Sequence, residues 1–181
     1  MDVAGAWSFL KQSDLVASAE EVQAALRRVA LQIDARLSGA YPLVLAVMGG
    51  AVVFAGQLLP LLRFPLDFDY IHVSRYGAAT RGAAIDWRVT PPESVRGRTV
   101  LVVDDILDGG DTMAAIRERL LALGAEAFLC AVLVEKTLER QKPIQADFVG
   151  LRIPDRFVFG YGMDAKGYWR NLPEIRAMHG S

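Results

Sequence analysis

The stretch that decides the fold is VLVVDDILDGGDTM, Val100 to Met113. The continuous β-branched run that begins at Thr99, TVLVV, predicts a central parallel strand covered on both faces. An acid pair and a glycine pair follow at once, and apolar residues then recur at helical spacing up to Gly124. The stretch therefore predicts a strand, a turn and a helix in direct succession.

The same alternation continues on both sides of this stretch. Upstream, LVLAVM (43–48) predicts a buried strand, GG a turn, AVVFAGQLL (51–59) a helix and LDFDYIHV (66–73) another strand. Downstream, AFLCAVLV (127–134) predicts the strand that closes a βαβ unit. We expect an α/β fold with a mostly parallel, Rossmann-like central sheet flanked by helices, in which ligands bind beyond the carboxyl ends of the strands.

The remaining segments predict smaller features around this sheet. Ser18 and Glu21 form a capping box before an amphipathic helix that we expect to stop at Gly39. RYGAATRGAA (75–84) predicts a mobile loop, and IDWRV (85–89) a short strand. From Lys142 the chain is aromatic and irregular enough to form a cap. We expect one domain, 1–181, with a core at about 40–150 and a hood from about 151–181 plus the N-terminal segment.

Composition excludes several functional classes. The net charge of -1 provides no overall field for nucleic acid or an anionic membrane, so we expect neither as a partner. The uncharged run between Arg36 and Arg63 is broken by glycines and prolines, which favours buried elements over a membrane span. The N-terminus lacks the pattern of a secretory signal, and the single Cys130 fits a buried thiol in a reducing compartment, so we expect a cytoplasmic protein.

Four carboxylates lie within eight residues of the deciding stretch, namely Asp104, Asp105, Asp108 and Asp111. Such a cluster needs a cation, hydroxyl donors or open water to offset its repulsion. Glycines at a helix N-terminus let backbone N–H groups approach an anion closely, which favours a phosphate. The acid pair at the strand tip suits sugar hydroxyls or Mg²⁺. The alternative, a solvated turn whose acids cap the helix, explains the acid pair poorly.

This stretch resembles the phosphoribosyl-pyrophosphate signature of the type I phosphoribosyltransferases. The C-terminal part, EKTLERQKPIQADFVGLRIPDRFVFGYGMDAKGYWRNLPEI, is similar to hypoxanthine-guanine phosphoribosyltransferases, and the resemblance spans roughly Leu43 to Ile175. It implies Mg²⁺ as cofactor, phosphoribosyl pyrophosphate and a 6-oxopurine as substrates, and a homodimer or homotetramer. The ribose and 5'-phosphate site that it implies consists of Asp104, Asp105, Asp108, Gly109, Gly110, Asp111 and Thr112, with Asp108 as the catalytic base.

The resemblance also implies a base pocket and a pyrophosphate loop. Lys136 would donate to the purine 6-oxo group, Phe157 would stack on the ring, the Val158 backbone would address its Watson–Crick edge, and Asp164 would lie near the 2-position. The implied pyrophosphate site consists of Met48, Gly49, Gly50 and Arg170, the mobile loop carries Arg75 and Tyr76, and the metal ligands are Asp104 and Asp105, with Asp164 near a second ion. Many relatives carry lysine at the position of Met48 and a hydroxyl residue at that of Gly109.

The implied reaction is transfer of the 5-phosphoribosyl group to N9 of hypoxanthine or guanine, giving IMP or GMP and pyrophosphate in purine salvage. The chemistry of the pocket agrees, because a lysine that faces an oxygen acceptor disfavours adenine, whose 6-amino group is a donor. Three alternatives stay open on the sequence. The first is the same chemistry with a xanthine-guanine preference or a much broader purine range, and the second is an RNA-binding regulator on the same fold. The third is a phosphate-accepting signalling domain, which would also use an acid pair with Mg²⁺ but would not require the pocket of Lys136 and Phe157.

Overall fold

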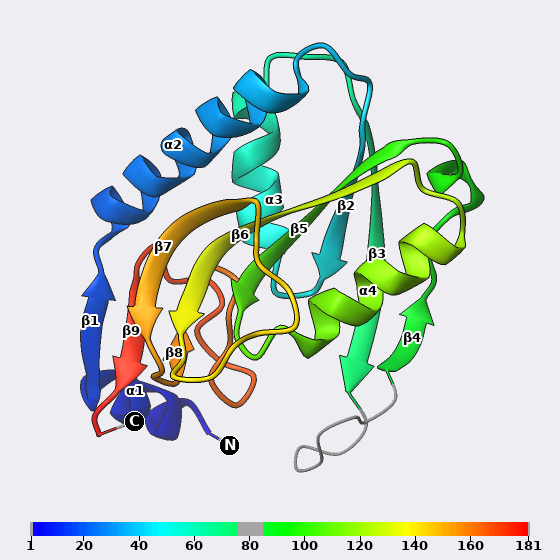
Figure 1. Cartoon of the computed structure of the whole chain (residues 1–181). Helices are drawn as coiled ribbons and strands as arrows, with labels where there is room; N and C mark the ends of the chain where they lie inside the picture. Colours follow the sequence, from blue (N-terminus) through cyan, green and yellow to red (C-terminus); the bar gives the residue numbers. More distant parts are fainter. Residues whose placement is uncertain (1, 76–84, 181) are drawn as a thin grey trace.

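The computed structural model describes residues 2–75 and 85–180. Its core is a six-stranded sheet in the order β4-β3-β2-β5-β6-β7 (Figure 1). The strands are β2 (Leu43–Met48), β3 (Asp67–Arg75), β4 (Ile85–Val89), β5 (Thr99–Leu107), β6 (Ala127–Thr137) and β7 (Phe148–Pro154). All neighbouring pairs are parallel except β3 with β4. The predicted fold class, a mostly parallel α/β sheet, is confirmed.

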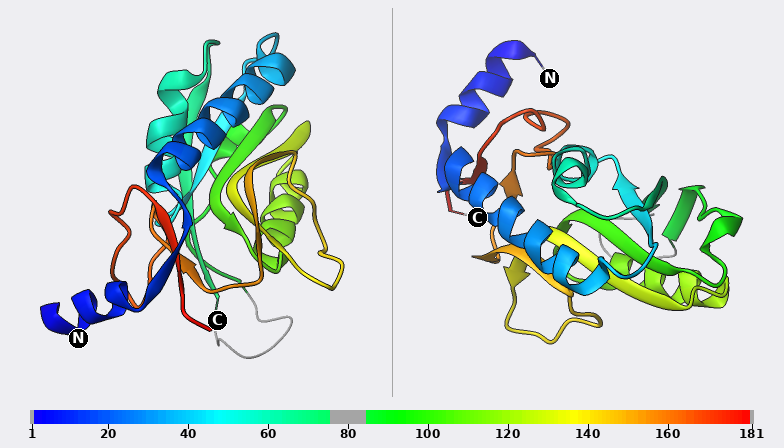
Figure 2. Two further views of the ribbon diagram at one scale, coloured as in Figure 1. Left: turned by 90° about the vertical axis from the view of Figure 1, so that its left-hand side faces the viewer. Right: turned by 90° about the horizontal axis from the view of Figure 1, so that it is seen from above.

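Helices cover both faces of this sheet (Figure 2, left). Helices α2 (Ala19–Leu37) and α3 (Val52–Leu58) lie on one face and α4 (Asp111–Ala122) on the other, with single 3-10 turns at Leu59–Leu61 and Glu93–Val95. Alternate residues of β5 supply the two cores: Leu101 packs with α2 and α3, whereas Val102 packs with α4. The period of two along a fully covered strand explains why the sequence reads as a continuous apolar run.

Local sequence signals predicted some ends of the helices and strands correctly and others wrongly. The capping box is present, because the Ser18 side chain accepts from the N–H of Glu21 and the Glu21 carboxylate accepts from the N–H of Ser18 at 2.8 Å. The helix then ends at Leu37, and Gly39 follows outside the left-handed region, so it is not the expected glycine stop. Strand β5 continues through the acid pair to Leu107, which leaves only three residues between it and α4.

A second, antiparallel sheet in the order β1-β9-β8 joins the two ends of the chain. It consists of β1 (Ser13–Ala17), β8 (Val158–Phe159) and β9 (Ile175–Met178), and we call these strands with the chain from Asp155 to β9 the hood. The sequence did not predict β1 or the helix before it, α1 (Val3–Lys11). Strand β7 pairs in parallel with β6, so the core sheet extends to Pro154, past the point where we expected the cap to begin.

Two expectations concern burial. Cys130 is fully buried in β6, and burial raises the pKa of its thiol to about 12, so the predicted inert core cysteine is confirmed. Within the described residues, none of the helices combines the length and the apolar character that crossing a bilayer requires.

Candidate active site

The turn between β5 and α4 consists of Asp108, Gly109 and Gly110. Gly110 is the N-cap of α4 and has a φ of 89°, a left-handed conformation that a side chain would strain. As a glycine it also has no side-chain oxygen to offer to the first N–H groups of the helix. The turn therefore presents the positive end of α4 directly beside the ends of the parallel strands.

The acid pair lies in the last part of β5, beside this turn. The backbone N–H of Asp105 donates to Asp104 Oδ1 at 2.9 Å. Burial raises the pKa of the Asp104 carboxyl well above its usual range, and the neighbouring charge of Asp105 adds to the rise. Burial also raises the pKa of Asp105, although the Asp104 hydrogen bond and the charge of Arg170 oppose it. The negative charge of such a pair needs compensation, which a cation or hydrogen bonds from hydroxyl groups can provide.

The glycine pair after β2 lies against these acids. A Cβ atom at Gly50 would fall 1.8 Å from Asp105 Oδ2, and a Cβ atom at Gly162 would fall 2.0 Å from the Gly50 carbonyl oxygen. Neither position accepts a side chain, because the contacts are far closer than van der Waals distance. The loop that begins at Met48 is thus enclosed between the acid pair on one side and the hood on the other.

Lys136, near the end of β6, connects the turn to the hood. Its Nζ atom lies 3.3 Å from Asp108 Oδ2 and 3.2 Å from Asp155 Oδ1. Its side chain is only 10% exposed, whereas those of Asp108 and Asp155 are 57% and 63% exposed. A lysine is rarely this buried unless it is paired, and here both of its partners reach it from loops.

Two adjoining cavities of about 240 and 190 Å³ open beside these residues. The first is lined by the acid pair, Ile106, Leu107, Asp108, Gly110, Thr112 and Met113. The second is lined by Asp105, Ile106, Asp108, Lys136, Phe157, Val158, Met163 and Asp164. Phe157 is 47% exposed, which is unusual for a large apolar ring and indicates a surface that a flat ligand could cover. Together the cavities fall within the usual size of small-molecule sites, about 300–1,000 Å³.

Two other predicted residues contact each other. Arg170 Nη2 donates to Asp164 Oδ1 at 2.5 Å, and Arg170 Nη1 donates to the Gly162 carbonyl oxygen at 2.6 Å. The second carboxylate oxygen of Asp164 accepts from the N–H of Gly167 at 2.7 Å. This network fixes the segment of the hood that lies over the Gly50 loop.

The structure thus brings together most of the residues that the sequence nominated. The two cavities are lined by the acid pair and by Asp108, Gly110, Thr112, Lys136, Phe157, Val158 and Asp164, and the Gly50 loop and Arg170 border them. Arg75 is the last residue of β3, and Tyr76 lies outside the described residues. In the described part of the chain, no three acidic, histidine or cysteine side chains converge closely enough to hold a metal ion by themselves.

Sequence reasoning missed three residues that shape this site. Asp155 contacts Lys136. Lys142 Nζ donates to the carbonyl oxygens of Leu107 at 3.1 Å and Lys136 at 2.5 Å, which joins the ends of β5 and β6. The Arg140 guanidinium lies over Gly109, where a Cβ atom would be 2.7 Å from its Nη2 atom. The position of Asp155 two residues before the stacking candidate was a usable signal, but nothing local pointed to the other two.

Comparison with known proteins agrees with this geometry. The sequence profile of the phosphoribosyl transferase domain matches residues 14–166. The chain belongs to this family. Its phosphoribosyltransferase relatives include the hypoxanthine-guanine phosphoribosyltransferase of Bacillus subtilis, 33% identical over 87% of this chain and 88% of the relative. That of Aquifex aeolicus is 32% identical over 91% of this chain and 94% of the relative.

Solved structures of this family have the same fold. A hypoxanthine-guanine phosphoribosyltransferase from Bacillus anthracis superposes with a TM-score of 0.83 at 31% identity, covering 91% of this chain and 95% of that one. A hypoxanthine phosphoribosyltransferase from Staphylococcus aureus gives a TM-score of 0.88 at 26% identity, covering 94% of both chains. The type I phosphoribosyltransferase fold expected from the sequence is confirmed, and the protein is a transferase.

Proposed function

We propose that this phosphoribosyltransferase acts in purine salvage and transfers the 5-phosphoribosyl group from phosphoribosyl pyrophosphate to N9 of hypoxanthine or guanine. The products are IMP or GMP and pyrophosphate. The observation that carries the proposal is the pair formed by Lys136 and Asp108, 3.3 Å apart beside the exposed ring of Phe157. This pair offers one donor and one acceptor to the edge of a flat ligand stacked on the ring.

The donor and acceptor fit the edge of a 6-oxopurine. In the tautomer of free guanine that carries its proton on N7, O6 is an acceptor and N7–H a donor on the same edge, and N9 keeps the lone pair that forms the new bond; hypoxanthine shares this edge. The Lys136 ammonium would donate to O6, while the Asp108 carboxylate would take the proton from N7. Adenine presents a 6-amino donor instead, which would leave the buried ammonium without an acceptor. Discrimination of this polar kind can reach about 10⁴-fold where a site is built around it.

The other cavity suits the sugar-phosphate donor. Backbone N–H groups from Gly109 to Thr112, with the Thr112 hydroxyl, would hold the 5'-phosphate at the N-terminus of α4. Asp104 and Asp105 would accept hydrogen bonds from the ribose hydroxyls. The N–H groups of the Met48 to Gly50 loop, together with Arg170, would bind the pyrophosphate, whose negative charge grows as it leaves.

Magnesium fits the Asp104–Asp105 pair as an ion shared between these carboxylates and the substrate phosphates. Mg²⁺ prefers oxygen and commonly uses one or two carboxylates together with substrate phosphates and water. The raised pKa of both acids of the Asp104–Asp105 pair is the observation that favours a cation there. Asp164 would lie near a second ion, but Arg170 and the Gly167 N–H already hold its carboxylate. When bound, Mg²⁺ would offset charge on the departing pyrophosphate.

The residues of this chain would then divide the reaction between them. The C1' bond to pyrophosphate breaks with its electron pair leaving on pyrophosphate, and N9 of the purine forms the new bond to C1'. Asp108 accepts the proton that the purine loses, and one positioned base of this kind typically contributes 10²–10⁴-fold. Lys136 and the backbone donors stabilise the charges that develop, which is usually the larger part of the rate enhancement.

A pyrophosphate-release assay tests the proposal directly. The protein is incubated with Mg²⁺, phosphoribosyl pyrophosphate and hypoxanthine, guanine, xanthine or adenine in turn. We expect rapid release with hypoxanthine and guanine and little with adenine. Release with none of the purines would refute the proposal, and a clear excess with xanthine would replace it with the xanthine-guanine alternative. Competition among the bases at equal concentration then ranks them.

Three further expectations belong to the proposal, namely the oligomeric state, the location and the domain organisation. We propose a homodimer or homotetramer in the cytoplasm, by analogy with the family to which the chain belongs, and residues 1–181 as one catalytic domain. Light scattering at several protein concentrations measures the oligomeric state, and a monomer at all of them would contradict it.

A further inference from the structure

Asp155 lies in the turn between β7 and β8 and forms the second ion pair of Lys136. Its Oδ1 atom is 3.2 Å from Lys136 Nζ, a separation equal within 0.1 Å to the 3.3 Å that joins Lys136 to Asp108. An ammonium has three N–H donors. Two of them serve these carboxylates, and the third can serve a ligand in the cavity that Lys136 lines with Phe157.

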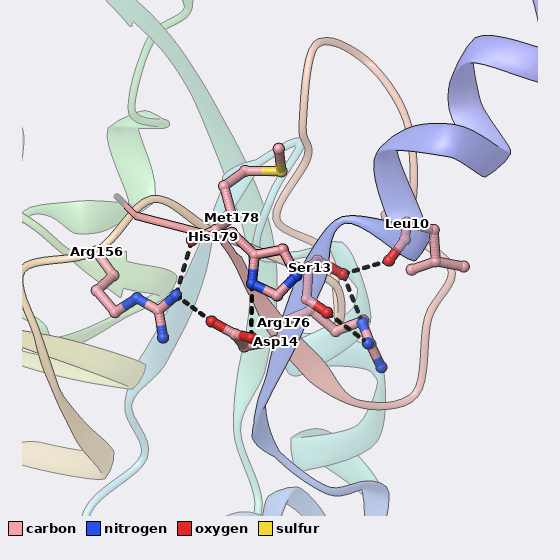
Figure 3. Close-up of polar contacts among 7 residues, drawn as sticks. All are labelled: Leu10, Ser13, Asp14, Arg156, Arg176, Met178 and His179. Atoms are coloured by element: carbon pink, nitrogen blue, oxygen red, sulfur yellow. Dashed lines mark hydrogen bonds and ion pairs between the residues drawn. The ribbon is translucent and has the colours of Figure 1, made fainter.

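The turn that carries Asp155 is held from two directions. The next residue, Arg156, points to the other side and donates through Nη2 to Asp14 Oδ2 at 2.6 Å and to the Met178 carbonyl oxygen at 2.7 Å (Figure 3). The Arg156 N–H closes the turn by donating to the Pro154 carbonyl oxygen at 2.8 Å. The turn is therefore fixed to β1 and β9 on one side and, through Asp155, to Lys136 on the other.

A charge argument gives Asp155 a specific part in the proposed reaction. Asp108 is the other counter-ion of Lys136, and in the reaction it accepts the proton that leaves the purine and becomes neutral. Without Asp155, the mostly buried ammonium would then lose its remaining carboxylate partner at the moment when it must stabilise the 6-oxo group. A mostly buried charge without a partner is costly.

We propose that Asp155 is a positioning residue, which keeps the Lys136 ammonium paired with a carboxylate and directed at the purine 6-oxo group while Asp108 carries the proton. This inference rests on the function proposed above. Its atoms balance, because the proton passes from the purine to the Asp108 carboxylate and Asp155 neither gains nor loses one. Asp155 contacts Lys136, which lines the cavity assigned to the base and not the cavity assigned to the 5'-phosphate, so its effect falls on the base and not on the donor.

The first test is Asp155→Asn, which keeps the shape and removes the charge. We expect kcat/KM for hypoxanthine to fall about five- to tenfold, less than for a fully buried pair because Asp155 is 63% exposed. The KM for phosphoribosyl pyrophosphate should change by less than about twofold. Asp155→Glu, which restores the charge, should recover part of the loss.

Glu139→Gln is the matched control. Glu139 lines a further cavity, of about 620 Å³, together with Asp108 and Asp155. No hydrogen bond or ion pair joins it to Lys136. Its substitution makes the same change of charge in the same place. We expect it to leave both kinetic parameters within about twofold of the wild type, so that a general field effect is excluded.

The decisive measurement repeats Asp155→Asn in a Lys136→Met background, with IMP affinity by calorimetry beside kcat/KM. If Asp155 acts through Lys136, the second substitution adds less than about twofold to the loss. An undiminished loss in that background, or an Asp155→Asn variant equal to Glu139→Gln, would overturn the inference. A wild type that uses no 6-oxopurine would instead refute the proposed function, so the two failures are distinguishable.

Discussion

The turn between β5 and α4 and the hood border the same cavities but are built differently. In the turn, three residues connect a buried strand to a helix, and the backbone of this short stretch presents the N–H groups that suit an anion. In the hood, the turn that carries Asp155 is held by residues far away in the sequence, because Arg156 donates to Asp14 and to the Met178 carbonyl oxygen. Asp164 is held by nearer residues, Gly167 and Arg170. The comparison teaches that the proposed phosphate site is built locally in this chain, whereas the proposed base site depends on tertiary contacts around Lys136.

The largest effect that tests this difference between the turn and the hood is expected from Asp108→Asn, which changes a side chain of the turn without changing its backbone. We expect kcat to fall by about 10²–10⁴-fold, because an amide cannot accept the purine proton. The KM for phosphoribosyl pyrophosphate should change little, since the N–H groups proposed to hold the phosphate remain. Steady-state pyrophosphate release measures both, and full activity would remove Asp108 from the mechanism.

A smaller effect is expected from loosening the hood alone with Arg156→Gln. The substitution removes the ion pair to Asp14, in which the side chains are 26% and 42% exposed. We expect the KM for hypoxanthine to rise about three- to tenfold, because the ring of Phe157 is no longer held in place, while the KM for phosphoribosyl pyrophosphate stays constant.

Arg152→Gln provides a control for that change. Arg152 lies on β7 and pairs with Glu135 through a side chain that is 68% exposed, outside the hood. Its substitution should leave both KM values unchanged. Equal effects of the two substitutions on the base and the donor would contradict the division between a local and a tertiary part of the site.

A third prediction concerns the stability that the protein loses by burying the Asp104 carboxylate beside the turn. Folding raises the pKa of Asp104 above its usual value of 3.8 through burial and the charge of Asp105. The folded protein is therefore penalised above about pH 4, where the unfolded chain loses the proton, and the penalty grows as the pH rises toward the folded pKa. Asp104→Asn should raise the Tm of the metal-free protein at pH 7.

Thermal unfolding in a chelator checks this, and the gain should shrink as the pH is lowered toward 4. For a chain of this length, about 1 kcal/mol corresponds to about 2–4 °C. Glu118→Gln on the exposed face of α4 is the control and should leave the Tm unchanged. A Tm for Asp104→Asn that is lower at pH 7 than at pH 4, relative to the wild type, would contradict the sign.

The smallest effect is expected from Gly109→Ser. A Cβ atom there would lie 2.7 Å from Arg140 Nη2 and 3.2 Å from Asp111 Oδ2. Because the guanidinium ends a flexible side chain, it can move aside, and the KM for phosphoribosyl pyrophosphate should rise by less than about threefold. In an Arg140→Ala background the same substitution should cause no rise. A persistent rise there would show that the crowding comes from elsewhere.

Much of the core was predictable because its signals are local. The β-branched run before Asp104 specified a buried strand, and the apolar spacing up to Gly124 specified α4, which ends at Ala122. The prediction placed the acid pair at the tip of the strand, but β5 continues to Leu107 because its last residues pair with β6. The predicted cap began too early in the chain for the same reason. Strand β7 joins the core sheet by pairing with β6, and its sequence shows no strong strand pattern of its own.

The sequence by itself determined the strand-turn-helix around the acid pair, the parallel sheet and the residue types of the site, because hydrophobic period, glycine conformation and helix capping act within a few residues. Only the tertiary structure decided that β1 pairs with β9 and that Lys136 lies between Asp108 and Asp155. Those contacts join residues 19 or more positions apart, where burial and charge pairing take effect only once the chain has folded.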